Sequence, residues 1–545
     1  MEILKIEDLT FTYPQCSSPA VKNVSFDIKK GEFTVLCGTT GSGKSTLLRL
    51  LKRELAPLGQ KEGCIKYKNT PIEELPKNES ACSIGFVMQN PEHQIVTDKV
   101  WHELAFGLEN MGVPHNVIAR RVAEMASYFG IENWYEQSIS ELSGGQKQLL
   151  NLAAVMVMNP DVLILDEPTA QLDPIAASDF ITTLKKLNND FSLTVIIAEH
   201  RLEELIPICD RLIILENGNL LDNAAPRDVI SRLNGNNNLL CMMPTAARLY
   251  RALSENGVCP LTVREGRRFI EENYLCHTRS LDTVKYTHKN RPALEFHEVY
   301  FRYERESADI LRGLNFTVYE NEIFCMLGGN GSGKTTSLNA AAGLLKPYSG
   351  NIRVFGKKLK EYKNQSLYRE CISLLPQDVQ TVFLKNTVRE ELCDANADIS
   401  TLPFDISHLY DKHPYDLSGG EQQLVAMSKV LATKPKLLLM DAPTKGLDAN
   451  KKANMIEILK RLKDNGVTVV IVTHDVEFTA MCADRCALFF RGQIVSDGVP
   501  EEFFSENNFY TTSASRISKD YYERAVTVEH VVELCKLNGK KDGST

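Results

Sequence analysis

Apolar residues along the chain predict strands that alternate with helices, and the same pattern occurs twice. Apolar and polar residues alternate from Ile3 to Tyr13 and again from Leu294 to Tyr303, as in strands with one buried face. Unbroken apolar runs follow, and these are typical of strands buried on both faces: FTVLC (33–37), VLILD and TVIIAEH in the first half, then IFCML (323–327), LLLMD and VTVVIVTH in the second. In each half a helix and then a long helical stretch separate the first run from the other two. The sequence therefore predicts an α/β fold with mostly parallel sheets.

The last predicted strands of each half form a hairpin, because LIILENGNL and ALFFRGQIV each contain a glycine turn between two apolar segments.

The two halves align through a series of identical residues: Tyr13 with Tyr303, Lys44 with Lys334, Gln89 with Gln377, Ser143 with Ser418, Asp166 with Asp441, and His200 with His474. The second half is shorter between Gln377 and Ser418, so we expect a smaller insert there. Such a duplication predicts two related domains.

The order of these segments predicts two cores, each followed by a tail. The first core spans residues 1–235, a small helical tail spans 236–276, and a polar, basic linker spans 277–292. The second core spans 293–508 and is followed by a C-terminal tail at 509–545. The tails are also similar, since PTAARLYRAL and LTVREGRRFIEE resemble TSASRISKDY and VTVEHVVELC.

Length and composition narrow the class of protein. A chain of 545 residues is long enough for about two to four domains. The apolar fraction of 43% is ordinary for a globular protein, and a formal net charge of −8 gives no support for nucleic-acid binding. No uncharged apolar run reaches the length of a transmembrane helix, and the charges in MEILKIEDLTFTYP argue against a signal peptide. The 14 cysteines form no CxxC pairs, so reduced cytosolic thiols are expected.

Two glycine-rich segments, GTTGSGKST and GGNGSGKTT, follow predicted strands and precede predicted helices. Glycines let backbone N–H groups face a phosphate, and the helix N-terminus behind them favours an anion. Lys44 and Lys334 are expected at the β- and γ-phosphates, and Ser45 and Thr335 at Mg²⁺. The expected cofactor-binding residues of these loops are Gly38, Thr39, Thr40, Gly41, Ser42, Gly43, Lys44, Ser45, Thr46, Gly328, Gly329, Asn330, Gly331, Ser332, Gly333, Lys334, Thr335 and Thr336.

A second motif, LSGGQ in the first half and LSGGEQ in the second, stands before an apolar helix. Serine and two glycines at a helix start can form an anion site, although a simple helix cap would explain either copy alone. Each copy follows its phosphate loop and precedes its strand-end aspartate, which favours a nucleotide role. The candidate residues are Ser143, Gly144, Gly145, Gln146, Ser418, Gly419, Gly420 and Glu421.

These motifs together resemble the ATP-binding cassette (ABC) ATPases over nearly all of both cores. The resemblance implies P-loop NTPase cassettes with a parallel sheet core, an antiparallel β subdomain and a helical subdomain. It implies that two cassettes close head to tail, each signature loop capping the ATP of the other. It also implies stacking of Tyr13 and Tyr303 on adenine, for which core packing is the alternative.

The remaining roles follow from the same resemblance. Gln89 and Gln377 are expected to contact Mg²⁺ or the attacking water and to sense a membrane partner. Asp166 and Asp441 would hold Mg²⁺ through water, and His200 and His474 would reach the γ-phosphate. Asp173 and Asp448 match the D-loop. Glu167 resembles the general base.

The second copy has Ala442 where the first has Glu167. Site one would combine Lys44, Asp166, Glu167 and His200 with Ser418 and Gly420, and site two would combine Lys334, Asp441 and His474 with Ser143 and Gly145. Loss of a general base typically costs about 10²–10⁴ in rate, so site two is expected to bind ATP without efficient hydrolysis.

The segment QNPEHQIVTDKVWHELAFGLEN resembles one branch in particular, the ATPases of energy-coupling-factor (ECF) vitamin importers. That resemblance implies a transmembrane coupling protein and a substrate-binding membrane protein as partners, no nucleic acid, and a peripheral location at the cytoplasmic face of a bacterial plasma membrane. Tails in that branch help to hold the two cassettes together. The second copy, PQDVQTVFLKNTVREEL, is a looser match. Alternatives are a tandem sugar-importer ATPase and a soluble, translation-associated tandem ABC ATPase.

Overall fold

The structure is a computed structural model that describes residues 1–14, 16–233, 237–253, 257–275, 290–363, 366–369, 371–395 and 402–541. The chain divides into two compact units, Met1–Pro244 with Gly257–Leu261, and Thr245–Asn256 with Thr262–Thr545. Most of the linker expected at 277–292 lies outside the described residues. No helix in the described part of the chain is long and apolar enough to cross a membrane.

The first unit contains a six-stranded sheet in the order β10-β9-β3-β8-β7-β6, in which only β10 runs antiparallel. Its strands are β3 (Phe33–Gly38), β6 (Ile84–Val87), β7 (Val162–Asp166), β8 (Thr194–Ala198), β9 (Arg211–Glu216) and β10 (Asn219–Ala224). Every residue of β3, β7 and β8 is buried, as their unbroken apolar runs predict. The mostly parallel sheet is thus confirmed.

A smaller antiparallel sheet of the first unit has the order β2-β1-β4-β5. Its strands are β1 (Glu2–Thr12), β2 (Val21–Lys29), β4 (Gln60–Tyr67) and β5 (Thr70–Pro71). Apolar side chains of β1, β2 and β4 share one buried cluster with the adjoining face of the larger sheet.

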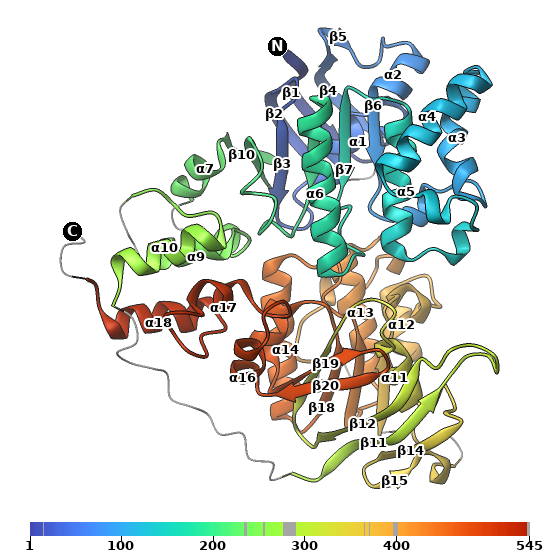
Figure 1. Ribbon diagram of the computed structural model, residues 1–545, viewed down its shortest axis with the longest axis vertical. Helices are drawn as coiled ribbons and strands as arrows, with labels where there is room; N and C mark the ends of the chain where they lie inside the picture. Colours follow the sequence, from blue (N-terminus) through green and yellow to red (C-terminus); the bar gives the residue numbers. More distant parts are fainter. Residues whose placement is uncertain are drawn as a thin grey trace. The chain divides into compact units, whose positions relative to one another are not determined.

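The helices of the first unit cover and flank the larger sheet. They are α1 (Lys44–Leu50), α2 (Lys77–Ser83), α3 (Val100–Asn110), α4 (His115–Tyr128), α5 (Gly144–Val157), α6 (Pro174–Phe191), α7 (Pro226–Arg232) and α8 (Asn237–Leu240). Figure 1 shows α3, α4 and α5 grouped at one side of the first unit, where α5 packs on β6. The expectation of one long helical stretch between α1 and β7 is wrong, because β4, β5 and β6 also lie there. β6 has only four residues, too few to show a period.

The second unit repeats this plan with sheets in the orders β16-β17-β18-β13-β19-β20 and β12-β11-β14-β15. The larger sheet consists of β13 (Ile323–Leu327), β16 (Ile372–Leu375), β17 (Leu437–Asp441), β18 (Thr468–Val472), β19 (Arg485–Phe490) and β20 (Gln493–Gly498). The smaller sheet consists of β11 (Pro292–Phe301), β12 (Leu311–Tyr319), β14 (Ser349–Val354) and β15 (Lys357–Lys358). Its cassette helices are α11 (Lys334–Ala341), α12 (Val388–Asp394), α13 (Gly419–Leu431), α14 (Ala449–Asp464), α15 (Val476–Cys482) and α16 (Pro500–Glu506).

Both predicted hairpins are confirmed, and both use the same turn. Asn217 and Gly218 join β9 to β10 with φ of 50° and 82°, and Arg491 and Gly492 join β19 to β20 with 48° and 83°. Two successive residues with positive φ form the turn whose twist matches antiparallel strands, and glycine accepts this conformation readily.

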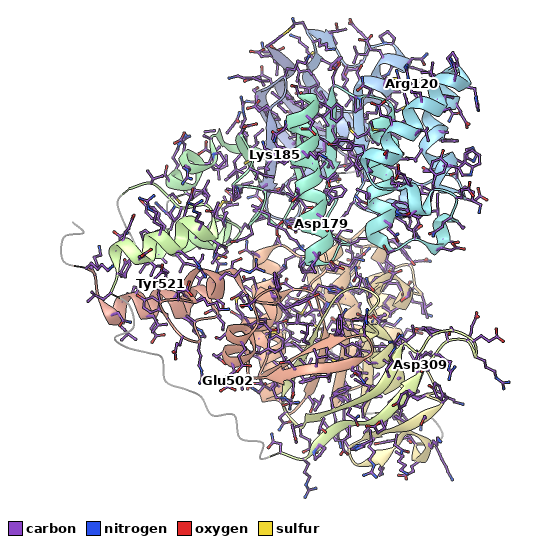
Figure 2. All side chains as sticks on the ribbon, viewed as in Figure 1. Arg120, Asp179, Lys185, Asp309, Glu502 and Tyr521 are labelled. Atoms are coloured by element: carbon purple, nitrogen blue, oxygen red, sulfur yellow. The ribbon has the colours of Figure 1, made fainter. Side chains whose placement is uncertain are left out.

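The two tails pack together within the second unit, although they are far apart in the sequence (Figure 1). The helices are α9 (Thr245–Ala252), α10 (Val263–Asn273), α17 (Ser513–Ser518) and α18 (Val528–Asn538). Side chains from all four helices, with Tyr522 between α17 and α18, form one buried cluster. Tyr521, labelled in Figure 2, donates a hydrogen bond to Glu271 at 3.2 Å.

The internal similarity of the tails extends to their helix caps. Thr262 accepts the N–H of Glu265 at the start of α10, and Thr527 accepts the N–H of His530 at the start of α18. A threonine in this position satisfies one of the free N–H groups of a helix start.

Candidate nucleotide sites

Each glycine-rich segment lies where a central strand passes into a helix, β3 into α1 and β13 into α11. Gly38 has φ of 153° and Gly328 has 154°, and a Cβ atom on either would lie 2.2 or 2.3 Å from a backbone carbonyl oxygen of the neighbouring strand. Only glycine fits so close an approach. The loops therefore lie at the carboxyl edge of a parallel sheet and before a helix N-terminus, which is where such folds bind ligands.

The two loop lysines occupy equivalent places. Lys44 Nζ donates to the carbonyl oxygens of Gly38 at 2.9 Å and Thr39 at 3.1 Å, and Lys334 Nζ donates to those of Gly328 at 3.0 Å and Gly329 at 2.8 Å. Both lysines are 5% exposed. Each ammonium group is thus fixed inside its own loop.

Parallel strands bring the other candidate residues to the same edge. In the first sheet the neighbouring strands β6, β7, β8 and β3 end next to Gln89, Asp166, His200 and the phosphate loop. In the second sheet β16, β17, β18 and β13 end next to Gln377, Asp441, His474 and the second loop. The glutamine, aspartate, histidine and phosphate loop of each copy are therefore gathered at one sheet edge, whereas the tyrosines and signature serines lie on other elements.

The two strand-end aspartates contact the hydroxyl residue of their own loop. Ser45 Oγ donates to Asp166 Oδ1 at 2.9 Å, and Thr335 donates to Asp441. Burial raises the pKa of Asp166 to about 6, opposed by the hydrogen bond from Ser45, and burial also raises the pKa of Asp441. Each carboxylate is nearly buried, and a cation would stabilise its charged form.

The donor set fits Mg²⁺. A hydroxyl, a carboxylate and a glutamine amide supply only oxygen ligands, which a hard divalent ion prefers, and Mg²⁺ usually keeps water and substrate phosphates as further ligands. Among the described residues no group of three or more His, Cys, Asp or Glu side chains is placed to hold a metal ion.

Glu167 is the centre of a three-residue network in the first unit. His200 Nε2 lies 2.9 Å from Glu167 Oε1, and Gln89 Nε2 donates to Glu167 Oε2 at 2.8 Å. The side chains of Glu167 and His200 are only 12% and 11% exposed. Glu167 is thus a nearly buried carboxylate, held between His200 and Gln89, and an ionised carboxylate acts only as an acceptor.

Ala442 has the same backbone conformation as Glu167 but no acid. Glu167 has φ of 46° and donates its N–H to Ala198 at 2.9 Å, whereas Ala442 has φ of 48° and donates to Val472 at 2.8 Å. A left-handed residue other than glycine costs about 1–2 kcal/mol. The second unit therefore retains the strained turn that presents a side chain at this position, although a methyl group cannot accept a proton.

The candidate adenine-stacking residues both hydrogen-bond to the phosphate-loop helix. Tyr13 lies 3.0 Å from Thr46 Oγ1 and Tyr303 lies 3.3 Å from Thr336 Oγ1. Tyr13 packs partly against the buried cluster of the first unit, whereas Tyr303 is 63% exposed. The exposure of Tyr303 argues against core packing as its role.

Both signature serines cap a helix. The N–H of Gln146 donates to Ser143 Oγ at 3.3 Å at the start of α5, and the N–H of Glu421 donates to Ser418 Oγ at 3.4 Å at the start of α13. In each case the third residue of the helix accepts the serine N–H in return, which completes a capping box.

The glycines Gly144 and Gly419 leave open space beside these caps, since a Cβ atom on either would meet nothing within 4 Å. Asp173 and Asp448 in turn cap α6 and α14, by accepting the N–H groups of Ala176 and Lys451.

Glu199 was not identified from the sequence, although it lies between β8 and His200. It is a carboxylate with 2% exposure at the carboxyl edge of the sheet. The signal that could have found it is the charged residue in TVIIAEH at a position where the second copy has Thr473.

The fold and its two sites define the class of this protein. Two phosphate loops, each at the carboxyl edge of a parallel sheet with a strand-end aspartate and a serine-capped helix, define a tandem nucleoside triphosphatase. The model of the family described as ABC transporter matches residues 21–170 and 311–445. The chain therefore belongs to the ABC transporter family, and it is an ABC-type ATPase with two ATP-binding cassettes.

Relatives match nearly the whole chain. A candidate ABC transporter ATP-binding protein of Bacillus thuringiensis subsp. konkukian is 39% identical over 97% of this chain and 98% of its own length. A candidate HMP/thiamine import ATP-binding protein, YkoD of Bacillus subtilis, is 30% identical over 97% of both chains. The solved archaeal ribosome recycling factor aABCE1 shares the fold, with a TM-score of 0.59 at 19% identity over 92% of this chain and 91% of its own.

Proposed function

We propose that this chain is the ATP-hydrolysing, energy-coupling subunit of an ECF-type importer, with one hydrolytic nucleotide site and one that holds ATP. The observation that supports the asymmetry is the pair of equivalent positions Glu167 and Ala442, which share one backbone conformation and differ in the acid. The proposal of import is supported by the residues QNPEHQIVTDKVWHELAFGLEN and by the B. subtilis relative, which is named as an HMP/thiamine import ATP-binding protein.

In the hydrolytic site Glu167 accepts the proton of the attacking water. Its contacts with His200 and Gln89 fix the carboxylate in position, and an ionised carboxylate is the acceptor that a general base requires. Lys44 and the loop N–H groups hold the phosphates. Ser45, Gln89 and Asp166 would hold magnesium, which neutralises charge on the phosphate oxygens when it is bound with ATP.

In the second site Lys334 and the loop N–H groups hold ATP, and Thr335, Gln377 and Asp441 would hold its magnesium. His474 is the counterpart of His200 in the second copy. Ala442, the counterpart of Glu167, cannot accept the proton of water. Because a general base contributes about 10²–10⁴ in rate, this site retains nucleotide far longer than the first.

The two sites are composite in this proposal. Ser418 and Gly420 complete the site of Lys44, and Ser143 and Gly145 complete the site of Lys334. The open space beside each capped helix supports this role, because a phosphate could approach the free N–H groups there.

The proposed partners are a transmembrane coupling protein and a small substrate-binding membrane protein. The chain would act at the cytoplasmic face of the plasma membrane, where the segments after Gln89 and Gln377 contact the coupling protein. The fold likeness to a ribosome recycling factor gives no support to a ribosomal role, since at 19% identity it concerns the fold alone.

The test is purification of the full chain from its native membrane in mild detergent, followed by identification of the co-purifying proteins and small molecules. We expect two membrane proteins and a bound micronutrient. Recovery with ribosomes, or with a sugar-specific permease, would contradict the proposal.

A further inference from the structure

Glu199 is a buried carboxylate on which three hydrogen-bond donors converge. Its Oε1 accepts the N–H of Thr169 at 2.8 Å and the Thr169 hydroxyl at 2.6 Å, and its Oε2 accepts the N–H of His200 at 3.1 Å. The residue is 2% exposed. Burial raises the pKa of the Glu199 carboxyl, and the hydrogen bonds from Thr169 oppose that effect by stabilising the charged form.

The donors come from the two turns that carry the catalytic candidates. Thr169 belongs to the turn that begins at Glu167, which is closed by the N–H of Ala170 donating to Glu167 at 3.2 Å. His200 opens the other turn, and its Nε2 reaches back to Glu167 Oε1 at 2.9 Å. Glu199 therefore ties the backbone around the base to the backbone around the histidine.

The second unit shows what these turns look like without the acid. Thr473 stands in the place of Glu199, and its Oγ1 lies 3.5 Å from Thr444 Oγ1, at the outer limit of a hydrogen bond. Thr473 Oγ1 also accepts the N–H of Asp475 at 3.1 Å. The backbone hydrogen bond from Ala442 to Val472 is nevertheless retained.

This comparison separates a structural role from a catalytic one. If the fold needed a buried carboxylate to join these turns, the second cassette would need it too. Instead, Glu199 and the proposed base Glu167 occur together in the first cassette. The second cassette has Thr473 and Ala442 at these two positions. A buried carboxyl group is costly to keep away from water, so its presence beside Glu167 and its absence beside Ala442 point to a function in hydrolysis.

We propose that Glu199 is a positioning residue for hydrolysis at the first nucleotide site, fixing the Thr169 turn and the His200 backbone so that Glu167 meets the attacking water. This inference rests on the proposed role of Glu167 as general base. Glu199 does not touch the substrate in this account, and it acts through Glu167 and His200.

The test begins with Glu199→Thr, which gives the first cassette the residue that the second cassette already tolerates. Misplacement of a reacting group by about 1 Å can cost about 10² in rate, so we expect kcat to fall 10- to 100-fold. The dissociation constant for ATP should change less than about two-fold, since Lys44 and Ser45 keep their contacts. Both are measured on the full chain assembled with its membrane partners.

Glu199→Gln provides a second variant of nearly the same shape. Its amide oxygen can still accept from Thr169, but its amide N–H₂ then faces the N–H of His200, so we expect a smaller loss of kcat than with threonine. Thr473→Ser is the matched control in the second cassette, and it should leave kcat and ATP binding unchanged.

A double-mutant cycle distinguishes positioning from a general structural effect. In a Glu167→Gln background the further change Glu199→Thr should reduce the residual single-turnover rate less than two-fold, because its effect passes through Glu167. Wild-type kcat in a folded Glu199→Thr protein, or parallel loss of ATP binding and kcat, would overturn the inference. If Glu167→Gln itself retained normal hydrolysis, the proposed base would fail instead, so the two failures are distinguishable.

Discussion

Replacement of Glu167 by glutamine removes one proton acceptor and little else. The side chain keeps its length, and Gln89 can turn its amide so that its oxygen faces the new amide N–H₂. Glu167 has φ of 46°, and glutamine has the same branching at Cβ, so we expect the backbone strain to be unchanged. We therefore expect the free energy of unfolding to change by less than about 1 kcal/mol and ATP to bind with near wild-type affinity.

The rate of hydrolysis should respond very differently. A general base contributes about 10²–10⁴, and since tenfold in rate equals about 1.4 kcal/mol, the barrier should rise by about 2.7–5.5 kcal/mol. We expect no compensation by the second site, because Ala442 has no proton acceptor. The complex should therefore bind ATP and remain closed, with phosphate release reduced at least 100-fold.

The assay is steady-state phosphate release by the full chain in its membrane complex, with nucleotide retention measured after rapid gel filtration. Glu141→Gln, a change of an exposed glutamate in the same cassette, is the matched control and should hydrolyse ATP normally. Retention of more than about a tenth of the wild-type rate by Glu167→Gln would show that Glu167 is not the general base.

Three further changes test other parts of the account. Gln89→Ala should reduce substrate transport several-fold while ATP affinity stays within about two-fold, and equal transport by mutant and wild type would remove the coupling role. Ala442→Glu should create a second base on a backbone that already has the conformation of Glu167. ATPase activity should then rise up to about two-fold, or ATP hydrolysis should become uncoupled from transport. An unchanged ATPase rate with unchanged coupling would count against the missing base as the defect of site two. Lys429→Ala removes the ammonium group 2.5 Å from the buried Glu391. Because breaking a buried ion pair costs about 3–5 kcal/mol, urea unfolding should show clear destabilisation of the second cassette. An unchanged unfolding midpoint would mean that the ion pair contributes little to stability.

Sequence patterns predicted the parts of the fold that depend on local order. The unbroken apolar runs that became β3, β7 and β8 are confirmed, and so are both hairpins, because burial on two faces and a glycine turn leave a local signature. Strands β4 and β6 were missed, since β6 has four residues and β4 pairs with β1, about 55 residues away in the chain.

The candidate site likewise contains residues that the sequence predicted and residues that only the structure reveals. Lys44 and Asp166 were found because their motifs have fixed spacing, and the structure places them at one sheet edge. Glu199 and the pair of Lys429 with Glu391 were not found, because their partners are 30 and 38 residues away and no spacing rule joins them. Only the three-dimensional structure shows that a carboxylate in TVIIAEH meets the turn of Thr169.

Unequal hydrolysis at the two proposed nucleotide sites can be tested with the two signature serines. Ser143 and Ser418 have the same capping box, so loss of the cap should cost about 1 kcal/mol of stability in either case. Ser418 Oγ also lies 3.5 Å from Lys451 Nζ, so the free energy of unfolding is measured for both arginine variants before their activities are compared. Their functional consequences should differ, because Ser418 would complete the site that contains Glu167 and Ser143 the site that contains Ala442.

The measurement is single-turnover hydrolysis of ATP by Ser143→Arg and Ser418→Arg in the assembled membrane complex. The account predicts that Ser418→Arg abolishes hydrolysis, whereas Ser143→Arg mainly shortens ATP retention and slows turnover only indirectly. Equal losses of hydrolysis in the two variants would mean that the sites are functionally alike, and the claim based on Ala442 would be contradicted.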